Sequence, residues 1–353
     1  MSRLLIITQK VDEADDLLGF FVAWIREFAT HFDDVVVIAL ARGDFKLPEN
    51  VRVYSLGKER GRPKWRQALT FAKLLYRHTP NHGAVFCHMS PIFAIASWPL
   101  TRLRSSRLVL WYLHRSRTLR LRLALAMCDS LVTADATSLT VHSPKIIGVG
   151  HGIDTERFAC EREWSAWGKS PMRIISVGRI SPIKGYETLI DAICLLKERD
   201  IQAEARIIGR PVMSPDFPYD IRLRRMVRDR NLTPNIEFVG FVPYRDIAGH
   251  YQWADIAVGM TPPGGIDKSL LEAMACGCVV VTSNTVMSHD VKTAGVGLLY
   301  SFGSSRELAD VLEVLAGTNG AGMEEVSARL RATVRHRHPI RTAVERISAL
   351  LDA

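Results

Sequence analysis

The sequence predicts an α/β protein of two Rossmann-like domains, each a doubly wound parallel sheet. Three observations predict this class. Short runs of β-branched and aliphatic residues alternate with longer helical patterns. Some runs, such as 35–40, are apolar on both faces, as the strands of a buried parallel sheet are. The alternation begins again at residue 173, and a chain of 353 residues is long enough for about two domains.

Hydrophobic periodicity gives the elements in order. In the first half the expected strands are 4–8, 35–40, 51–55, 84–88, 108–113, 130–133 and 145–149, and the expected helices are 17–31, 65–77 and 119–127. In the second half the expected strands are 173–177, 203–208, 236–239, 256–259 and 279–282, and the expected helices are 186–198, 219–230, 245–253, 268–276, 305–315, 324–335 and 339–351. We expect a first domain over 1–147 and a second over 148–338, joined in the Gly-rich stretch 148–154.

The net charge of +9 belongs entirely to the first half. Residues 1–147 hold 21 Lys and Arg against 12 Asp and Glu, whereas the rest of the chain holds 25 of each. Between residues 50 and 122 there are 15 basic residues and one acidic residue, Glu59. This bias predicts an anionic partner or an anionic membrane surface, a solubilising surface being the alternative. The half carries no nucleic-acid-binding motif, so we do not expect nucleic acid as the partner.

The six cysteines lie far apart, except for Cys276 and Cys278, whose C-x-C spacing favours packing over a zinc site. Free thiols are typical of a reducing compartment. The first apolar run is too short for a signal peptide, and the stretch 89–100 contains two prolines and is too short to span a membrane. We therefore expect a cytoplasmic protein, attached at most peripherally to the inner face of a membrane.

Several common motifs are missing. No G-x-G-x-x-G follows the first strand, which disfavours a nicotinamide dehydrogenase, and the P-loop pattern is absent. The sequence also lacks H-E-x-x-H and G-x-S-x-G. These absences disfavour the best-known nucleotide, metalloprotease and hydrolase sites.

Two basic residues follow the predicted strand 173–177. Gly178 allows the chain to turn, and Arg179 and Lys184 stand at the carboxyl end of the strand, beside the start of the next helix. Two cations and the positive end of a helix dipole suit a diphosphate. The alternative is a turn that happens to carry two basic residues.

A turn-rich loop, 262–267, leads into the predicted helix 268–276, which ends at Gly277. Glu272 lies on this helix, where a carboxylate can accept two hydrogen bonds from a vicinal diol such as a ribose. A solvated surface glutamate is the alternative. Asp267 is placed to cap the helix.

Four segments resemble the retaining GT-B glycosyltransferases of family 4, the glycosyl transferases group 1 superfamily. They occur in the family's order at 150–158, 177–185, 238–243 and 270–277. The resemblance covers most of the second half, and the first half is similar more weakly. It implies the GT-B fold, in which two domains face a central cleft and the last helix, 339–353, packs back on the first domain.

The resemblance also implies site residues, position by position. Arg179 and Lys184 would bind the diphosphate of a nucleotide-sugar and take part in catalysis. Glu272 would bind the ribose hydroxyls, and residues 240–242 would line the nucleobase pocket. The full set of implied donor-binding residues in the second half is Arg179, Lys184, Gly240, Phe241, Val242, Asp267, Lys268, Ser269, Leu270 and Glu272.

Two further residues come from the first half. His114 ends the strand segment 108–113 and matches the family's catalytic histidine near the donor sugar, a structural histidine being the alternative. Gly19 corresponds to the family's first Gly-rich loop, whose backbone N–H groups approach the donor phosphates. The alternative there is an ordinary helix entry capped by Asp15 or Asp16.

One position departs from the family's E-x7-E pattern. Gly264 stands eight residues before Glu272, where family members carry a glutamate that contacts the donor sugar. Either Asp267 substitutes for it, the sugar is held differently, or activity is reduced. We favour a variant active site, because the phosphate and ribose positions are intact.

The resemblance implies a retaining hexosyltransferase that moves a sugar from a nucleotide-sugar, with UDP as the favoured nucleotide, to a lipid-linked or glycan acceptor in glycan biosynthesis. We expect no cofactor and no metal, because two cations can neutralise the leaving diphosphate and no D-x-D triplet is present. The basic first half would be the acceptor side. The alternatives are a non-catalytic nucleotide-sugar-binding protein with a degenerate E-x7-E motif and a phosphorylase or epimerase of the same fold.

Overall fold

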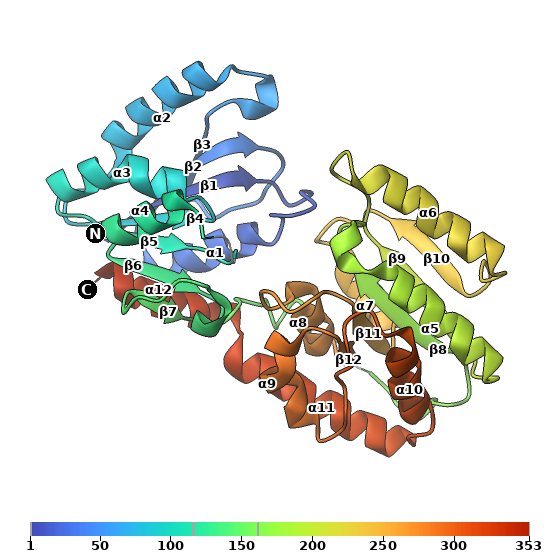
Figure 1. Cartoon of the computed structure of the whole chain (residues 1–353). Helices are drawn as coiled ribbons and strands as arrows, with labels where there is room; N and C mark the ends of the chain where they lie inside the picture. The colour runs from blue at the N-terminus through green and yellow to red at the C-terminus, as the bar shows by residue number, and fades with distance from the viewer. Residues whose placement is uncertain (1, 115–116, 161, 353) are drawn as a thin grey trace. The chain divides into compact units, whose positions relative to one another are not determined.

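The computed structural model describes residues 2–114, 117–160 and 162–352, which divide into two compact units (Figure 1). Unit 1 comprises residues 1–152, 243–245 and 338–353, and unit 2 comprises residues 153–242 and 246–337. Each unit is built on one sheet in which every assigned strand pairing is parallel. Parallel sheets need covered faces, and helices cover both sheets.

The sheet of unit 1 has seven strands in the order β3-β2-β1-β4-β5-β6-β7. Their bounds are β1 Arg3–Val11, β2 Asp34–Arg42, β3 Val51–Ser55, β4 Ala84–His88, β5 Arg107–Trp111, β6 Ser130–Thr133 and β7 Ile146–Gly148. The central strand β1 pairs with β2 and β4, and its residues Leu4 to Thr8 are fully buried. The order reverses at β1, so the chain winds outward in both directions from the centre of the sheet.

Helices cover the two faces of this sheet (Figure 1). The helices α1 (Phe21–His31) and α12 (Ile340–Asp352) pack against each other, and α12 also contacts β4 and β5. The other face is covered by α2 (Lys64–His78), α3 (Pro91–Leu103) and α4 (Leu119–Met127), whose apolar side chains share one core with the sheet. The last helix of the chain is therefore part of unit 1.

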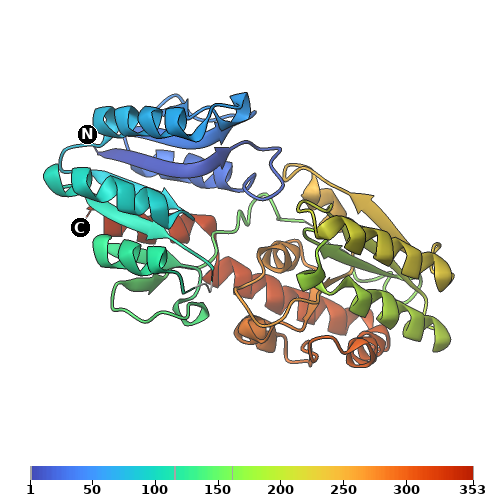
Figure 2. The ribbon, with the colours of Figure 1, turned by 45° about the horizontal axis from the view of Figure 1, so that its top comes forward.

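The sheet of unit 2 has five strands in the order β10-β9-β8-β11-β12. Their bounds are β8 Met172–Val177, β9 Ala203–Ile208, β10 Ile236–Gly240, β11 Ile256–Gly259 and β12 Val279–Thr282. The helices are α5 Tyr186–Glu198, α6 Asp216–Asp229, α7 Ile247–Trp253, α8 Lys268–Ala275, α9 Ser288–Val291, α10 Ser305–Ala316 and α11 Gly320–Arg337. Figure 2 shows α5 and α6 side by side, and α11 packs against α8 and β12.

The structure corrects the expected elements at two places in unit 1. Helix α3 lies where no helix was predicted. The helix tolerates Pro91 because this residue occupies the first turn, where a backbone N–H has no partner within the helix. Helix α1 begins at Phe21 and not at residue 17. The Asp15 carboxylate accepts hydrogen bonds from the N–H groups of Leu17 and Leu18 (3.0 and 2.8 Å), which closes a separate turn before the helix.

Within the described residues, no helix has the length and apolar character needed to cross a membrane.

Candidate active site

The carboxyl ends of four neighbouring strands form one edge of the unit 2 sheet. Since β10, β9, β8 and β11 are adjacent and parallel, the loops that follow them lie along the same edge. Ligands of doubly wound sheets bind at this edge. All ten donor-binding residues predicted in the second half belong to unit 2, and they lie at or after the carboxyl ends of three of these strands, β8, β10 and β11.

Two glycines bring the loops after β8 and β9 into backbone contact. Gly178 donates to the carbonyl of Ile208 (2.9 Å), and Gly209 donates to the carbonyl of Gly240 (2.8 Å). A Cβ at Gly209 would lie only 2.0 Å from the carbonyl oxygen of Gly178, and its φ of +138° also disfavours a side chain. The close approach places the segment after Gly178 directly beside the segment after Gly209.

Arg179 is held by a buried carboxylate. Its Nε lies 3.5 Å from Oδ2 of Asp216, whose side chain is 4% exposed. The same oxygen accepts hydrogen bonds from the backbone N–H groups of Val212 and Met213 (3.3 and 2.9 Å). The Asp216 carboxylate therefore both fixes the Arg179 side chain and orders the loop after β9.

Lys184 stands in the short 3-10 turn Pro182–Lys184, just before α5. Its Nζ lies 3.1 Å from Oδ2 of Asp267, and its side chain passes over Gly178, where a Cβ would come within 2.8 Å of Cε. A left-handed residue, Gly185 with φ +62°, then turns the chain into α5. The ammonium group is thus fixed between the loop after β8 and the loop after β11.

Asp267 occupies the N-cap position of α8, as the sequence predicts, but its carboxylate makes no capping hydrogen bond. It binds Lys184, and the Ser269 hydroxyl lies 2.8 Å from its Oδ1 and 3.0 Å from the carbonyl of Val177. Burial opposes ionisation of Asp267, yet the Lys184 charge and these hydrogen bonds hold its pKa below the ordinary value. Asp267 is therefore an anionic anchor for Lys184. Leu270, on the same helix, is buried in the core.

Glu272 is buried on α8 and forms an ion pair with Lys268, one helical turn earlier. The Tyr251 hydroxyl on α7 donates to its Oε2 (3.3 Å). Burial lowers the pKa of Lys268, against the attraction of Glu272 and of Asp154. The surface alternative for Glu272 is wrong, because only 5% of the residue is exposed and its carboxylate is oriented by two neighbours.

The segment 240–242 begins where β10 ends. The pairing with β9 shifts register between Phe238 and Gly240, and Gly240 has a φ of +85° that suits glycine. The Arg210 guanidinium lies 4.7 Å from the ring centroid of Phe241, and Val242 is partly exposed. This end of the sheet edge thus presents an aromatic ring, an aliphatic side chain and a cation.

Gly264, the departure from the family pattern, lies in the loop after β11. Its N–H donates to Oδ1 of Asn284 (3.4 Å), and the Asn284 side chain also donates to the carbonyl of Gly265 (2.8 Å). A Cβ at Gly264 would meet only the carbonyl oxygen of Pro262, at 3.6 Å. The buried Asn284 therefore shapes the loop, and the glycine is not required there by crowding.

Gly19 and His114 lie in unit 1. Gly19 is buried in the turn between β1 and α1, where a Cβ would come within 2.9 Å of the Asp15 carbonyl oxygen. His114 is exposed after β5, with its ring edge-on to Tyr112 at 5.5 Å between centroids. Arg115 and Ser116, which follow His114 in the basic region 50–122, lie outside the described part of the chain.

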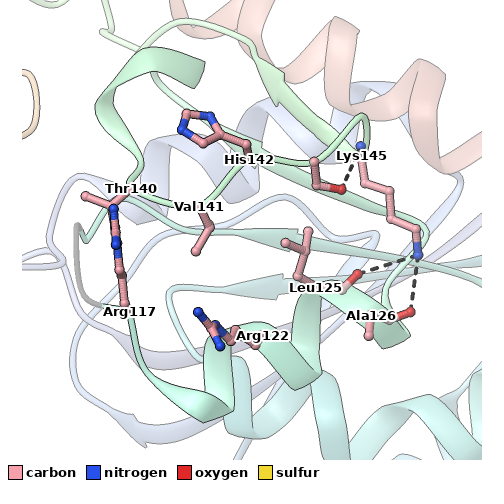
Figure 3. A pocket seen from close by; sticks show the side chains of 9 residues that line it. Arg117, Arg122, Leu125, Ala126, Thr140, Val141, His142 and Lys145 are labelled. Carbon is pink, nitrogen blue, oxygen red and sulfur yellow. Dashed lines mark hydrogen bonds between the residues drawn. The ribbon is translucent and has the colours of Figure 1, made fainter.

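Two arginines of the basic region 50–122, Arg117 and Arg122, line a cavity of about 640 Å³ in unit 1 (Figure 3). Arg117 and Arg122 point into the space between α4 and the segment 140–145. The Lys145 ammonium donates to the carbonyls of Ala126 and Cys128 (3.2 and 2.8 Å), at the carboxyl end of α4. Among the described residues no acidic side chain lines the cavity, which is formed by Arg117, Arg122, Leu125, Ala126, Thr140, Val141, His142, Ser143 and Lys145.

The site also contains residues that the sequence analysis did not find. Asp216 positions Arg179, which lies 37 positions away in sequence. Tyr251 positions Glu272, which lies 21 positions away. Their partners are far away in sequence, so no local spacing indicates them. The acid Asp216 in the first turn of a helix was the one available signal.

In residues 2–114, 117–160 and 162–352, no three or more His, Cys, Asp or Glu side chains are grouped so that they could hold a metal ion.

Comparisons with known proteins find similarity to glycosyltransferases. Residues 161–323 match the family "Glycosyl transferases group 1". The chain is 30% identical over 172 residues to the amylovoran biosynthesis glycosyltransferase AmsK of Erwinia amylovora, covering 46% of this chain and 39% of that one. It is 29% identical over 148 residues to the GDP-mannose-dependent alpha-(1-6)-phosphatidylinositol monomannoside mannosyltransferase of Mycolicibacterium smegmatis, covering 38% and 37%. The chain spans about half the length, or less, of the curated relatives it matches.

Solved structures resemble the whole chain. Alr3699/HepE of Anabaena, in complex with UDP and glucose, has a TM-score of 0.79 at 17% identity and covers 100% of both chains. The sucrose-phosphate synthase (tll1590) of Thermosynechococcus elongatus has a TM-score of 0.78 at 17% identity, covering 99% of this chain and 98% of that one. Together with the two parallel sheets, these similarities confirm the predicted GT-B fold.

Proposed function

We propose that this protein is a retaining hexosyltransferase that moves a sugar from a UDP-sugar to a lipid-linked or glycan acceptor. The observation that carries the proposal is the convergence of Arg179, Lys184 and Glu272 on one edge of the unit 2 sheet. Two fixed cations and an oriented carboxylate match the diphosphate and the ribose of a nucleoside diphosphate. The family match over residues 161–323 and the UDP complex of a protein of the same fold support this assignment.

The proposed chemistry depends on charge at the leaving group. In a retaining transfer the bond from the anomeric carbon to the diphosphate breaks through an oxocarbenium-like transition state, and the acceptor hydroxyl attacks the same face. Negative charge then develops on the departing diphosphate, so preorganised cations lower the barrier more than a general base does. Arg179 and Lys184 supply this charge from the protein itself, which is the reason we propose a reaction that needs no metal and no cofactor.

The carboxylates that hold the two cations set their positions before the donor binds. Lys184 is fixed by Asp267 and Arg179 by Asp216. Such preorganisation avoids reorganisation during the reaction. With Asp267 engaged in this way, we propose that the donor sugar is held differently from the family's E-x7-E arrangement, and not by a direct substitution of Asp267 for the missing glutamate. His114 keeps its proposed place near the sugar, supported only by its position after β5.

Unit 1 would bind the acceptor and a membrane surface. Between Glu59 and Asp129 the chain carries no acidic residue. Helix α2 exposes Trp65, Leu69 and Tyr76 beside its basic side chains, a pattern typical of helices that lie on anionic membranes. The phosphatidylinositol monomannoside named for one relative and the amylovoran biosynthesis named for another agree with a lipid-linked or glycan acceptor. We place the enzyme in the cytoplasm, at the inner face of the membrane; its six cysteines are free thiols.

Isothermal titration with UDP and UMP tests the donor site. We expect the wild-type protein to bind UDP more tightly than UMP, because only UDP offers a β-phosphate to the cations. Arg179→Ala and Lys184→Ala should each reduce the UDP-over-UMP ratio by about tenfold or more, the effect of one charge-assisted hydrogen bond. Arg225→Ala, which removes an exposed arginine of α6, is the matched control and should leave the ratio unchanged. A ratio unaffected in both site variants would contradict the assignment.

The second candidate is a non-catalytic nucleotide-sugar-binding protein, which Gly264 favours because the sugar-contacting glutamate is missing. Release of UDP from UDP-sugars, with and without polyprenyl-phosphate-linked glycans, separates the two functions. Tight UDP binding without any release of UDP would favour the binding protein. Transfer or hydrolysis above the uncatalysed rate would favour the enzyme.

A further inference from the structure

Three cysteines of unit 2 lie around the carboxyl end of α8. Cys276 directly follows the last residue of this helix, and Cys278 directly precedes β12. Cys160 lies in the first segment of unit 2, before β8. The sulfur atoms of Cys160 and Cys276 are 3.1 Å apart although the two residues are 116 positions apart in sequence. This distance is shorter than ordinary contact between sulfur atoms and about 1 Å longer than a disulfide bond.

The two thiols of this pair differ in environment. Cys160 is partly exposed, whereas Cys276 is fully buried. A hydrogen bond with Cys276, outweighing burial, and the charges of Arg162 and Arg331 lower the pKa of Cys160 to about 7. The hydrogen bond to Cys160 and burial raise the pKa of Cys276. Cys160 is thus the more exposed and more readily ionised thiol of the pair, and Cys276 is the buried thiol beside it.

Two arginines hold this environment in place. Arg162 donates to the carbonyl of Tyr251 (2.9 Å) and pairs with Asp255 (3.4 Å), and its side chain is 6% exposed. Arg331 of α11 reaches under Gly277, where a Cβ would come within 2.1 Å of its Nη2. Neither guanidinium can deprotonate at neutral pH, so the positive charge beside Cys160 is permanent.

Cys278 does not belong to the reactive pair. Its sulfur lies 3.2 and 3.4 Å from the carbonyls of Tyr251 and Ala254, to which the thiol donates. Burial raises the pKa of Cys278 to about 12, so almost no thiolate is present. Within the C-x-C pair, Cys276 therefore faces the thiol of Cys160, whereas Cys278 is packed against backbone carbonyls.

We propose that Cys160 and Cys276 form a peroxide-sensitive modification site, in which oxidation closes a reversible disulfide. The Cys160 thiolate attacks one oxygen of hydrogen peroxide, the O–O bond breaks, and the hydroxide that leaves takes a proton to become water. The Cys276 thiol then attacks the Cys160 sulfenic acid, forming the S–S bond and releasing a second water. Two thiols and one hydrogen peroxide thus give one disulfide and two waters, and a dithiol reductant reverses the step.

The site touches the helix that carries Glu272. The N–H of Cys276 donates to the carbonyl of Glu272 (3.0 Å), and Asp154 and Arg157, upstream of Cys160, lie close enough to influence the charge on Lys268. The disulfide would therefore tie the segment 153–160 to α8 at the end opposite to Asp267. Formation of the bond itself does not depend on the proposed glycosyl transfer.

Peptide mapping of the oxidised full-length protein tests the proposal. The reduced, desalted protein is treated with a few equivalents of hydrogen peroxide, blocked with N-ethylmaleimide and digested for mass spectrometry. We expect a cross-linked peptide joining Cys160 to Cys276, lost after dithiothreitol. Cys276→Ser should instead accumulate sulfenic acid at Cys160, trapped by dimedone, and Cys160→Ser should leave Cys276 unmodified. Cys194→Ser, on the outer helix α5, is the matched control and should form the same cross-link.

Thermal unfolding gives a second readout that is independent of turnover. Oxidised wild-type protein should unfold at a higher temperature than reduced protein, because the bond closes a long loop in the unfolded chain. The increase should vanish in Cys160→Ser and Cys276→Ser, and the reduced variants should unfold near the reduced wild type. The proposal is wrong if both cysteines stay reduced while Cys194 is oxidised, or if the first cross-link joins Cys276 to Cys278. Because no nucleotide-sugar is used, such a failure would leave the proposed function untouched.

Discussion

The Nζ atom of Lys184 lies 3.1 Å from Oδ2 of Asp267, and the pair joins the loop after β8 to the first turn of α8. The Lys184 side chain is 23% exposed and the Asp267 side chain 13%. A largely desolvated pair holds its geometry better than a surface pair, and removal of one partner leaves the other charge uncompensated. The relationship thus couples the position of a proposed catalytic cation to the stability of unit 2.

Replacement of Lys184 separates these two effects. We expect Lys184→Ala to lower kcat by about 10²–10³-fold, the usual loss when one preorganised group is removed from a developing anion. It should also lower the free energy of unfolding by about 1–3 kcal/mol, because Asp267 loses its counter-charge. The double variant Lys184→Ala/Asp267→Asn should regain stability in urea unfolding without regaining turnover. Near-normal kcat in Lys184→Ala would contradict the role of this residue.

Glu272 should discriminate ribose from deoxyribose. We expect the wild-type protein to bind UDP at least tenfold more tightly than 2′-deoxy-UDP, because a hydrogen bond to a charged group contributes about 1.5–3 kcal/mol. Glu272→Gln should reduce this ratio several-fold. Tyr251→Phe, which removes the hydrogen bond to Oε2 and leaves the carboxylate charge, should reduce it less. The measurement is titration calorimetry with both nucleotides, and an unchanged ratio in Glu272→Gln would exclude a ribose contact.

Glycine is required at Gly209 and not at Gly264. In Gly209→Ala the new Cβ would collide with the backbone of Gly178 at 2.0 Å and the φ of +138° would be strained, so we expect a loss of about 3 kcal/mol or more. Gly249→Ala, in helix α7 with no heavy atom within 4 Å of the new Cβ, is the control and should be neutral or stabilising by up to about 1 kcal/mol. Gly264→Glu should also fold normally, because its Cβ meets only an oxygen at 3.6 Å. Urea unfolding compares all three, and equal losses at Gly209 and Gly249 would contradict the close approach.

The sequence predicted most strands because their signal is local. Runs such as 35–39 and 279–282 are buried on both faces in the structure, as expected for the strands of a covered parallel sheet. Helix α3 was missed because it contains Pro91 and Pro99, and proline usually interrupts a helix. From sequence alone, a proline in the first turn of a helix cannot be told from one that ends a strand. The start of α1 was misplaced because Asp15 caps a turn that precedes the helix.

The candidate site was predictable in part for the same reason. Arg179 and Lys184 follow a strand end and Glu272 lies on a short helix, all of which the sequence marks, so their spacing could be interpreted. Their anchors could not be found, since the contacts of Asp216, Asp267 and Tyr251 with them depend on which strands are neighbours in the sheet. That information is absent from local spacing and appears only when the order β10-β9-β8-β11-β12 is known.

The exposed side of α2 should bind anionic membranes. Trp65, Leu69 and Tyr76 are 59%, 64% and 69% exposed, and they share one side of a helix that contains no acidic residue. We expect the protein to sediment with vesicles containing phosphatidylglycerol, and less so at high salt, because screening weakens attraction to the surface. Trp65→Ser/Leu69→Ser should weaken this binding by about tenfold or more, since two apolar side chains are lost from the interface.

A matched control comes from unit 2, where Ile221 on α6 is exposed to a similar degree, 66%. Ile221→Ser should bind vesicles like the wild type. Equal binding of the wild type and the α2 variant would exclude α2 as the membrane contact, and equal sedimentation with neutral vesicles would exclude an electrostatic contribution.

His88 should make the stability of unit 1 depend on pH. Its ring is buried, stacks on Phe21 at 3.7 Å between centroids, and has Nδ1 3.1 Å from the Thr8 hydroxyl. In the described part of the chain its Nε2 makes no hydrogen bond. Burial lowers the pKa of His88 to about 3, so the folded protein keeps this imidazole neutral at pH values where the unfolded chain, with a pKa near 6.5, already takes up a proton.

The sign follows from this proton uptake. The contribution of neutral His88 to stability is fully present above pH 6.5 and is lost as the pH falls from 6.5 towards 3, by about 1.4 kcal/mol per pH unit. Urea unfolding of the wild type and His88→Asn between pH 7.5 and 4.5 measures the difference in slope, which is informative even if the variant is less stable throughout. We expect the variant to lose the excess slope, whereas His336→Asn, at an exposed position of α11, should keep it. Parallel curves for the wild type and His88→Asn would show that His88 is not the titrating group.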